Sequence, residues 1–349
     1  MKKMLLSALL CFTSVILFGS DSLTVENKIY PEIFACDGVK DAVCIDGQYY
    51  GQYPMSDEKA ESIGIPLNYD ECYKLFSSEE LSGNASALNN LGVCYLLGKG
   101  TEKDEEKAVE CFNKAQKFGS IVAKINMASC YQNGTGVEKN YYTAFGYLSG
   151  MEDNNNVIVL NLLGNFYRNG YGVVGDYAKA VELYRKAAAY GYAPAQGNLG
   201  ICYYNGYGVD KDYTKAIEWY SKAADQGLAD VQCCLAICYY NGYGVTQNYP
   251  KAVEWYRKAA EQGFVLAQFN LGACYDYGYG VAQNYSKAVE WYRKAAEQGD
   301  VPSQYNLGYA YEHGYGVTQN ISEAMKWYKL AADQGLKNAE NALSRLELQ

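Results

Sequence analysis

The chain has 349 residues, and its 30 lysines and arginines against 39 aspartates and glutamates give a formal net charge of −9. An acidic chain without a lysine/arginine block releases few counterions from a phosphate backbone, which argues against nucleic acid as the main partner. Its single histidine, His313, argues against a catalytic triad, a histidine-rich metal centre or a proton shuttle. The high counts of tyrosine (37) and glycine (35) indicate a biased, repeating sequence.

The first twenty residues have the features of a secretory signal peptide. Lys2 and Lys3 precede an apolar run that ends at Phe18, and small residues then lead into a polar stretch at Asp21. We therefore predict a signal peptide over residues 1–20. The mature protein is expected to be exported, either periplasmic or secreted.

Two alternatives to cleavage are an uncleaved membrane anchor and a lipid on Cys11. The apolar run is shorter than the roughly 20 residues that a membrane-spanning helix needs. Cys11 follows Leu10 rather than a small residue, and much of the apolar run lies beyond it. No later segment is apolar enough to span a bilayer, so we expect no membrane insertion after cleavage.

One unit of 36 residues recurs from residue 84 to residue 335 without insertion or deletion. The small residue of its Leu-Gly pair stands at Gly92, Ala128, Gly164, Gly200, Ala236, Gly272 and Gly308. All four tryptophans keep the same step, at Trp219, Trp255, Trp291 and Trp327. The sequence therefore predicts seven units.

Each unit contains two helical stripes of apolar residues. In the fourth unit, Ala195 and Leu199 lie on the first stripe, and Gly206 is a suitable residue to end that helix. Asp212 can cap the start of the second helix, and Gly227 ends it. One hairpin cannot bury both stripes, so stacking on neighbours must complete the core. The pattern predicts an all-α fold, an α-solenoid of αα-hairpins with a 36-residue period.

The segments outside the repeats are predicted to be an arm and two caps. Residues 21–67 show no period and are expected to form a loosely ordered arm. Residues 68–83 align with a second helix and are predicted to be an N-terminal capping helix. Residues 336–349 begin a first helix that no second helix follows, which predicts a C-terminal capping helix.

The repeat resembles a known family. The string Ala-x-x-x-Leu-Gly-x-x-Tyr-x-x-Gly-x-Gly-Val, followed by Asp/Asn-Tyr-x-Lys-Ala-x-x-Trp-Tyr-x-Lys-Ala-Ala-x-x-Gly, is similar to the Sel-1-like repeat, a relative of the tetratricopeptide repeat. The resemblance implies a right-handed α-solenoid with an adaptor role or a role in host or envelope interactions. The second unit departs most, because Gly146 and Gly150 fall inside its second helix. We expect the segment 141–153 to be frayed or bent.

Five of the twelve cysteines share one position on the buried stripe and are predicted to be small apolar core residues: Cys94, Cys130, Cys202, Cys238 and Cys274. Most of them are expected to face a tryptophan across the hairpin. In the first unit Cys94 faces Cys111 instead, and an exported protein could form this disulfide or one between Cys36 and Cys44 in the arm.

The sequence predicts no metal site and no cofactor. It contains no Cys-x-x-Cys pair, and Cys234 with Cys238 has no histidine to complete a zinc site. The chain is also similar to exported cysteine-rich Sel-1-like proteins of helicobacters, although those pair cysteines placed elsewhere in the repeat. Some of them are described as β-lactamases or penicillin binders.

An enzyme of that kind is the alternative to a binding scaffold. The chain has one Ser-x-x-Lys pattern, from Ser56 to Lys59 in the arm, without the Lys-Thr-Gly or Ser-Asp-Asn that accompanies it in serine β-lactamases. We therefore predict no catalytic residues and prefer a non-catalytic scaffold.

Variation between the units indicates where a protein or peptide partner would bind. Core positions repeat nearly unchanged, whereas one face of the first helix differs from unit to unit, and resemblance to tetratricopeptide solenoids places this face in the concave groove. The candidate residues on it are Tyr204, Tyr240, Phe269, Asp276, Tyr305 and Tyr309. Exposed aromatic residues are typical of recognition surfaces.

Asparagines at the edge of the same face are further candidates: Asn198, Asn270 and Asn306, with Asn90 and Asn126 in earlier units. Such an amide ladder can hold a peptide backbone. The alternative is that these amides bond to one another between repeats. The oligomeric state is not predicted.

Overall fold

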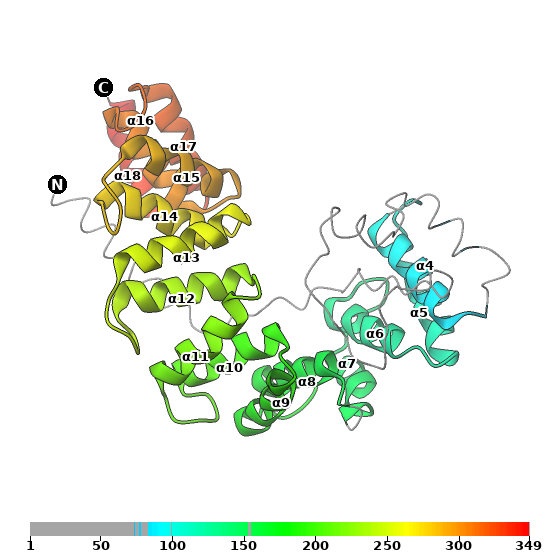
Figure 1. Cartoon of the computed structure of the whole chain (residues 1–349). Coiled ribbons are helices and arrows are strands. Elements are labelled where there is room, and N and C mark those ends of the chain that lie inside the picture. The colour runs from blue at the N-terminus through cyan, green and yellow to red at the C-terminus, as the bar shows by residue number, and fades with distance from the viewer. Residues whose placement is uncertain (1–72, 74–76, 78–82, 99, 153–154, 349) are drawn as a thin grey trace. The chain divides into compact units, whose positions relative to one another are not determined.

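The computed structural model describes residues 73, 77, 83–98, 100–152 and 155–348, which contain 15 α-helices and no strand (Figure 1). The all-α prediction is confirmed. The predicted signal peptide (1–20), the arm (21–67) and most of the N-terminal cap (68–83) lie outside the described residues.

The described residues form two compact units, 83–210 and 211–348, and in each of them every helix packs against the next one along the chain. The first unit contains α4 (Ala85–Leu97), α5 (Glu105–Lys117), α6 (Ile121–Asn133), α7 (Tyr141–Ser149), α8 (Val157–Asn169), α9 (Tyr177–Ala189) and α10 (Ala193–Asn205). The second contains α11 (Tyr213–Ala224), α12 (Ala229–Asn241), α13 (Tyr249–Glu261), α14 (Val265–Tyr277), α15 (Tyr285–Glu297), α16 (Val301–His313), α17 (Ile321–Asp333) and α18 (Lys337–Glu347). Stacked hairpins of this kind are the predicted α-solenoid arrangement.

The helices begin and end where the sequence places their caps. Gly206 ends α10 in the left-handed conformation, with φ 82°, and its N–H donates to the carbonyl of Cys202. The Asp212 side chain accepts a hydrogen bond of 3.0 Å from the Lys215 amide at the start of α11. These contacts satisfy backbone groups that a helix leaves free at its ends.

The second loop glycine holds successive hairpins close together. Gly280 has φ 72°, and a Cβ there would overlap the backbone of Tyr249 in the preceding unit. The ring of Tyr249 stacks on Tyr279 beside this contact, with 5.2 Å between the ring centroids. Because only glycine allows this approach, the Gly-x-Gly loop is a packing element between units.

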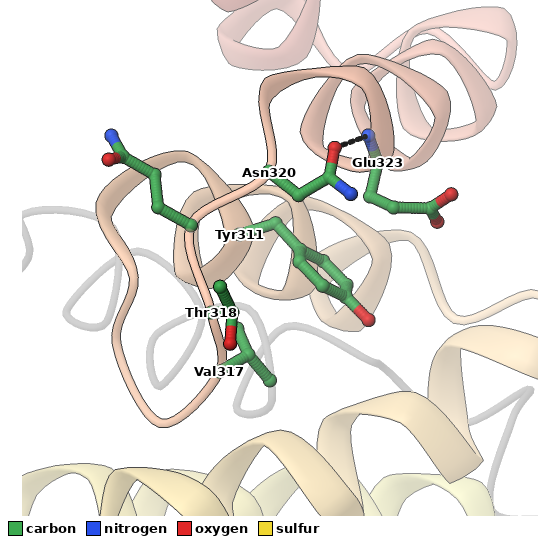
Figure 2. A pocket seen from close by; sticks show the side chains of 6 residues that line it. Tyr311, Val317, Thr318, Asn320 and Glu323 are labelled. Carbon is green, nitrogen blue, oxygen red and sulfur yellow. Dashed lines mark hydrogen bonds between the residues drawn. The ribbon is translucent and has the colours of Figure 1, made fainter.

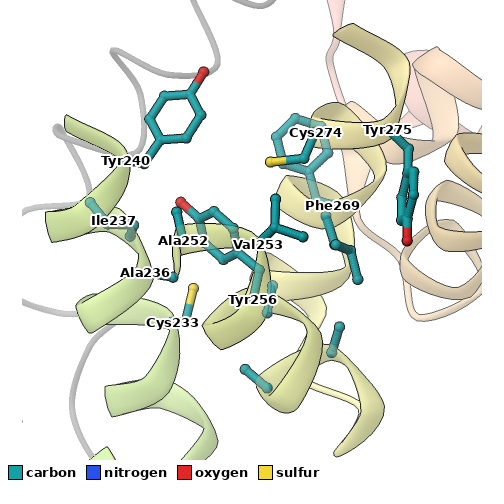
Figure 3. Close-up of a cluster of buried hydrophobic side chains, with 14 of the residues drawn as sticks. Cys233, Ala236, Ile237, Tyr240, Ala252, Val253, Tyr256, Phe269, Cys274 and Tyr275 are labelled. Atoms are coloured by element: carbon teal, nitrogen blue, oxygen red, sulfur yellow. The ribbon is translucent and has the colours of Figure 1, made fainter. Parts of the chain in front are cut away.

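The first and second helices are buried differently. In α10 every residue from Ala193 to Tyr203 is buried, whereas α13 buries one stripe that includes Val253 and Tyr256. First helices such as α14 pack against both the preceding and the following second helix, α13 and α15, whereas α16 keeps several half-buried residues. Figure 3 shows part of this core, where residues of α12, α13 and α14 meet.

The bulky residue of the core is a tyrosine and not the adjacent tryptophan. Trp291 is half-buried, and the ammonium of Lys294 lies 4.1 Å from its ring centroid. Tyr292 is 3% exposed and covers Gly272 of α14 so closely that a Cβ there would lie 2.8 Å from the ring. The five repeat cysteines are buried as predicted, but the tryptophans that most of them were expected to face are only half-buried, and the tyrosine next to each tryptophan is the buried aromatic residue.

The second hairpin is irregular, as its two helix-interior glycines suggest. Helix α7 has 9 residues, against 12 or 13 in the other second helices, and Gly150 is its C-cap. Asn155 has the positive φ of 51° that glycines adopt at the corresponding position of the other units. The helix thus ends early at Gly150, a residue type with low helix propensity.

Candidate functional site

Much of the first-helix face predicted to bind a partner is buried. The exposed fraction is 9% or less at Tyr240, Phe269, Asp276, Asn198 and Asn270. The prediction that this face is exposed is wrong at these positions, because neighbouring second helices enclose the first helices. Tyr204, Tyr305, Tyr309 and Asn306 are half-buried and retain accessible surface.

Phe269 belongs to the hydrophobic core of the compact unit 211–348. Its ring centroid lies 5.9 Å from that of Tyr292, and it shares a cluster with Cys233, Tyr256 and Cys274 (Figure 3). Variation at this position therefore reflects different ways of filling the same core volume, and a variable position is not by itself an accessible one.

The buried asparagines bond to one another between repeats. The amide of Asn198 donates to Asn161 at 2.9 Å and to Asn165 at 3.3 Å, and Asn126 donates to Asn89 at 3.0 Å. At Asn270 the residue equivalent to Asn161 is Cys233, so the amide-to-amide hydrogen bond between repeats is absent at this step. For Asn126 and Asn198 the structure favours a packing role over a peptide clamp.

Two carboxylates occupy the same position in the last two repeats. The Tyr292 hydroxyl donates to Asp276 at 3.2 Å, and burial raises the pKa of Asp276 to about 6. The Tyr328 hydroxyl donates to Glu312 at 2.7 Å, and Arg345 of α18 adds contacts of 2.6 and 2.9 Å to the same carboxylate. Burial alone would raise the pKa of Glu312, but the hydrogen bonds from Arg345 and Tyr328 hold it below its usual value.

An aromatic cluster lies beside these carboxylates at the end of α16. Tyr309 and His313 stack with 4.1 Å between centroids, His313 and Tyr315 lie 5.7 Å apart, and Tyr315 stacks on Tyr285 at 5.4 Å. Tyr285 and Tyr315 are both 39% exposed. His313 and Tyr315 were not among the residues predicted from the sequence, although His313 stands where the other repeats have Leu, Asn or Tyr.

A pocket opens at the last loop, between α16 and α17. Its volume is about 360 Å³, and its lining residues are Tyr311, Val317, Thr318, Gln319, Asn320 and Glu323 (Figure 2). The Asn320 side chain accepts from the Glu323 amide at 3.1 Å and so caps α17. This pocket was not predicted, and its signal is a glutamate at a repeat position that otherwise holds lysine or threonine.

The described cysteines, including Cys94 and Cys111, are buried and form no disulfide with one another. The disulfide predicted between Cys94 and Cys111 is therefore not formed in the structure, and Cys36 and Cys44 lie outside the described residues. Burial raises the pKa of Cys111 to about 11 and that of Cys202 to about 12. Such thiols are poor nucleophiles at neutral pH.

The described part of the chain contains no group of three histidine, cysteine or acidic side chains placed to hold a metal ion. None of its helices is both long and apolar enough to cross a bilayer. Ser56 and Lys59 lie outside the described residues, so the β-lactamase alternative stays a prediction that nitrocefin turnover by the purified chain would test.

The model of the Sel1 repeat matches seven segments of the chain: 85–115, 121–149, 158–192, 193–228, 229–264, 265–300 and 301–336. The chain belongs to the Sel1 repeat family. Its seven matched segments fall on the hairpins described above, and the predicted family resemblance is confirmed.

Solved structures agree with this assignment. A Sel1 repeat protein from Oxalobacter formigenes is 30% identical, with a TM-score of 0.65, and the match covers 79% of this chain and 81% of that one. A protective antigen of uropathogenic Escherichia coli strains, which displays an SLR fold, is 32% identical over 82% of this chain and 69% of that one, with a TM-score of 0.50. Yeast Tom70, at 14% identity, a TM-score of 0.51 and coverage of 97% and 71%, shares the fold alone. None of the curated proteins compared with this chain matches it.

Proposed function

We propose that this Sel1 repeat protein is a non-catalytic scaffold that binds a protein or peptide segment on the first-helix face of its last repeat. A stack of Sel1 repeats fits a role in protein interaction, since its fold presents extended surfaces without requiring a catalytic centre. The observation that carries the proposal is the accessible aromatic cluster of Tyr309, His313, Tyr315 and Tyr285, with the half-buried Tyr305 one turn before Tyr309 on α16.

These aromatic side chains offer contact area that is only partly used for packing. Tyr309 is half-buried, whereas Tyr328 of the same hairpin is 1% exposed. Tyrosine at a protein surface combines a large apolar ring with a hydroxyl that can hydrogen-bond, and it loses little conformational entropy on binding. The cluster thus has the composition of a recognition surface.

The side chains next to the aromatic cluster indicate which kind of partner segment it would bind. Burial is the main cause that raises the pKa of Tyr309, the neighbouring Tyr315 and Tyr305 follow, and Glu312 and Asp276 add smaller contributions. Among the described residues near this cluster, Arg345 is already paired with Glu312. Both carboxylates are buried, so the accessible surface of the cluster is mainly aromatic, and a segment with aromatic or aliphatic residues would be complementary to it.

Capture of partners from extracts of the source cells by the full chain would test the proposal, followed by affinity measurements with the recovered partner. Replacing Tyr309 with Ser should weaken binding at least tenfold, because aromatic anchors commonly contribute about 2 kcal/mol or more. A matched control is Tyr190→Ser, since Tyr190 is 63% exposed and lies in the other compact unit. Equal loss in both variants, or loss in neither, would contradict the assignment of the face.

We also propose that the protein is exported, on the basis of the signal-like sequence of residues 1–20. Mass spectrometry of the protein from its source cells should find a mature N-terminus near residue 21. A protein that retains Met1 and stays in the cytoplasm would rule out export by this route.

A further inference from the structure

Seven tyrosines occupy one position near the end of the first helices: Tyr95, Tyr131, Tyr167, Tyr203, Tyr239, Tyr275 and Tyr311. The residue twelve positions later, in the first turn of the second helix, is Lys107, Thr143, Lys179, Lys215, Lys251, Lys287 and Glu323. A basic residue is therefore usual beside the tyrosine, and the seventh repeat alone has an acidic residue there.

In three repeats the lysine ammonium lies over the tyrosine ring. The distance from Nζ to the ring centroid is 5.5 Å for Lys107 and Tyr95, and 5.3 Å both for Lys251 and Tyr239 and for Lys287 and Tyr275. A cation within about 6 Å of a tyrosine ring is attracted by its negative face. The repeat geometry thus contains a cation site that the chain fills with its own side chain.

In the seventh repeat the same position is an open pocket. Tyr311 and Glu323 both line the pocket of about 360 Å³, and in Figure 2 the Tyr311 ring lies between Glu323 on one side and the loop residues Val317 and Thr318 on the other. Glu323 makes a contact of 2.5 Å with Lys326, whose side chain is 66% exposed. Ion pairs at the surface are weak, so a second cation can compete for this carboxylate.

A neighbouring arginine does not fill the site. Arg293 donates to the Tyr311 hydroxyl at 2.6 Å, with its guanidinium carbon 5.6 Å from the ring centroid. In the sixth repeat Arg257 donates to the Tyr275 hydroxyl at 3.0 Å, and Lys287 still lies over the same ring. The arginine and a second cation can therefore share one tyrosine.

We propose that the pocket of Tyr311 and Glu323 binds the side-chain ammonium of a lysine from a partner protein. The ammonium would lie over the tyrosine ring as Lys287 does in the preceding repeat, and Glu323 would add a charge-assisted hydrogen bond. The aliphatic stem of the lysine would pack on Val317. The proposal rests on the scaffold function only in taking the partner to be a protein, because the pocket is distinct from the cluster of Tyr309 and His313.

A short lysine peptide tests the site without the natural partner. We expect acetyl-Gly-Lys-Gly-amide, titrated into the isotope-labelled full chain, to cause saturable NMR shifts at the amides of Thr318, Gln319 and Glu323. The same peptide with an acetylated lysine should bind at least tenfold more weakly, because it has no positive charge. A higher salt concentration should weaken the binding of the unmodified peptide but not that of the acetylated one. Equal binding of the two peptides, or no shifts around Tyr311, would overturn this proposal. The proposed partner binding at the first-helix face would be unaffected by that result.

Two substitutions exchange the residue beside the tyrosine between the sixth and the seventh repeat. Glu323→Lys places the usual lysine over Tyr311, so peptide binding should fall at least tenfold while the melting temperature stays close to that of the wild type. Lys287→Glu should open a second site at Tyr275 and double the number of peptides bound. If Glu323→Lys fails to fold, Glu323→Gln replaces it, with an expected loss of at least threefold. Wild-type binding by a folded Glu323 variant would refute the site.

Discussion

At the scale of single residues, the buried carboxylates show how one repeat position can have opposite electrostatic effects. Asp276 is 5% exposed and interacts with the uncharged Tyr292, so burial dominates and its pKa rises from its usual 3.8 to about 6. Glu312 is as deeply buried but is paired with Arg345, and its pKa is lowered. The difference lies in the arginine that α18 supplies.

The pKa of Asp276 leads to a prediction about stability and pH. Between about pH 4 and pH 6 the folded chain keeps a proton that the unfolded chain has lost, so the free energy of unfolding should fall as pH rises through this window. Asp276→Asn should remove this contribution and be more stable at pH 7, by up to about 3 kcal/mol if the whole shift is expressed. Denaturant titrations of both proteins at pH 4.5 and 7 would measure it. A steeper pH dependence in the variant would contradict the assignment.

The aromatic pair of α15 gives a second prediction. Tyr292→Ala should cost about 3–5 kcal/mol, because it leaves a cavity over Gly272. Trp291→Ala should cost about 2 kcal/mol or less, since Trp291 is half-buried and loses partial burial and one contact with Lys294. Urea unfolding of the two variants would rank them. A larger loss of stability in Trp291→Ala than in Tyr292→Ala would indicate that the tryptophan is the main core residue.

At the scale of helices and hairpins, the period and caps of the sequence predict nearly all of the architecture. Gly206 and Asp212 mark helix ends because their local conformations and hydrogen bonds depend on few residues. The accessible face could not be predicted in the same way. Whether Phe269 is exposed depends on contacts with Tyr292 across the stack, and a variable residue in a packed core looks the same in sequence as a variable residue in a binding groove.

The loop glycines give a prediction about packing between hairpins. Gly280→Ala combines a left-handed backbone with an overlap against the preceding hairpin, so it should destabilise the protein clearly more than backbone strain alone. Gly263→Ala is the matched control, because Gly263 has φ 88° and open space where its Cβ would lie. The control should cost about 1–2 kcal/mol. Similar losses in both would show that the close approach at Gly280 contributes little.

At the scale of the whole molecule, each hairpin depends on its neighbours, and the last one depends on α18. The capping helix packs on α17, with Ala339, Ala342 and Leu346 buried, and Arg345 pairs with Glu312 of α16. Terminal repeats of a solenoid need such a cover because one of their faces would otherwise be exposed. The sequence predicts this helix, whereas the Arg345 contact needs the three-dimensional register of α16 and α18.

Removing residues 337–349 should therefore destabilise the last hairpin more than the others. Hydrogen exchange measured by mass spectrometry should show faster exchange in α16 and α17, with little change in α12 and α13. Arg345→Ala should produce a weaker form of the same pattern, because it leaves the Glu312 carboxylate buried without its cation. Uniformly faster exchange along the whole chain would instead indicate one fully cooperative unit.

The repeated buried cysteines provide a built-in set of reporters on local opening. Cys94, Cys130, Cys202, Cys238 and Cys274 lie at one position in five different hairpins, each at most 1% exposed. A thiol reagent can reach such a sulfur only when its own hairpin opens, so the five alkylation rates in native buffer would give five separate opening free energies. Read along the chain, they would show whether this protein frays from its ends or opens first at the short helix α7.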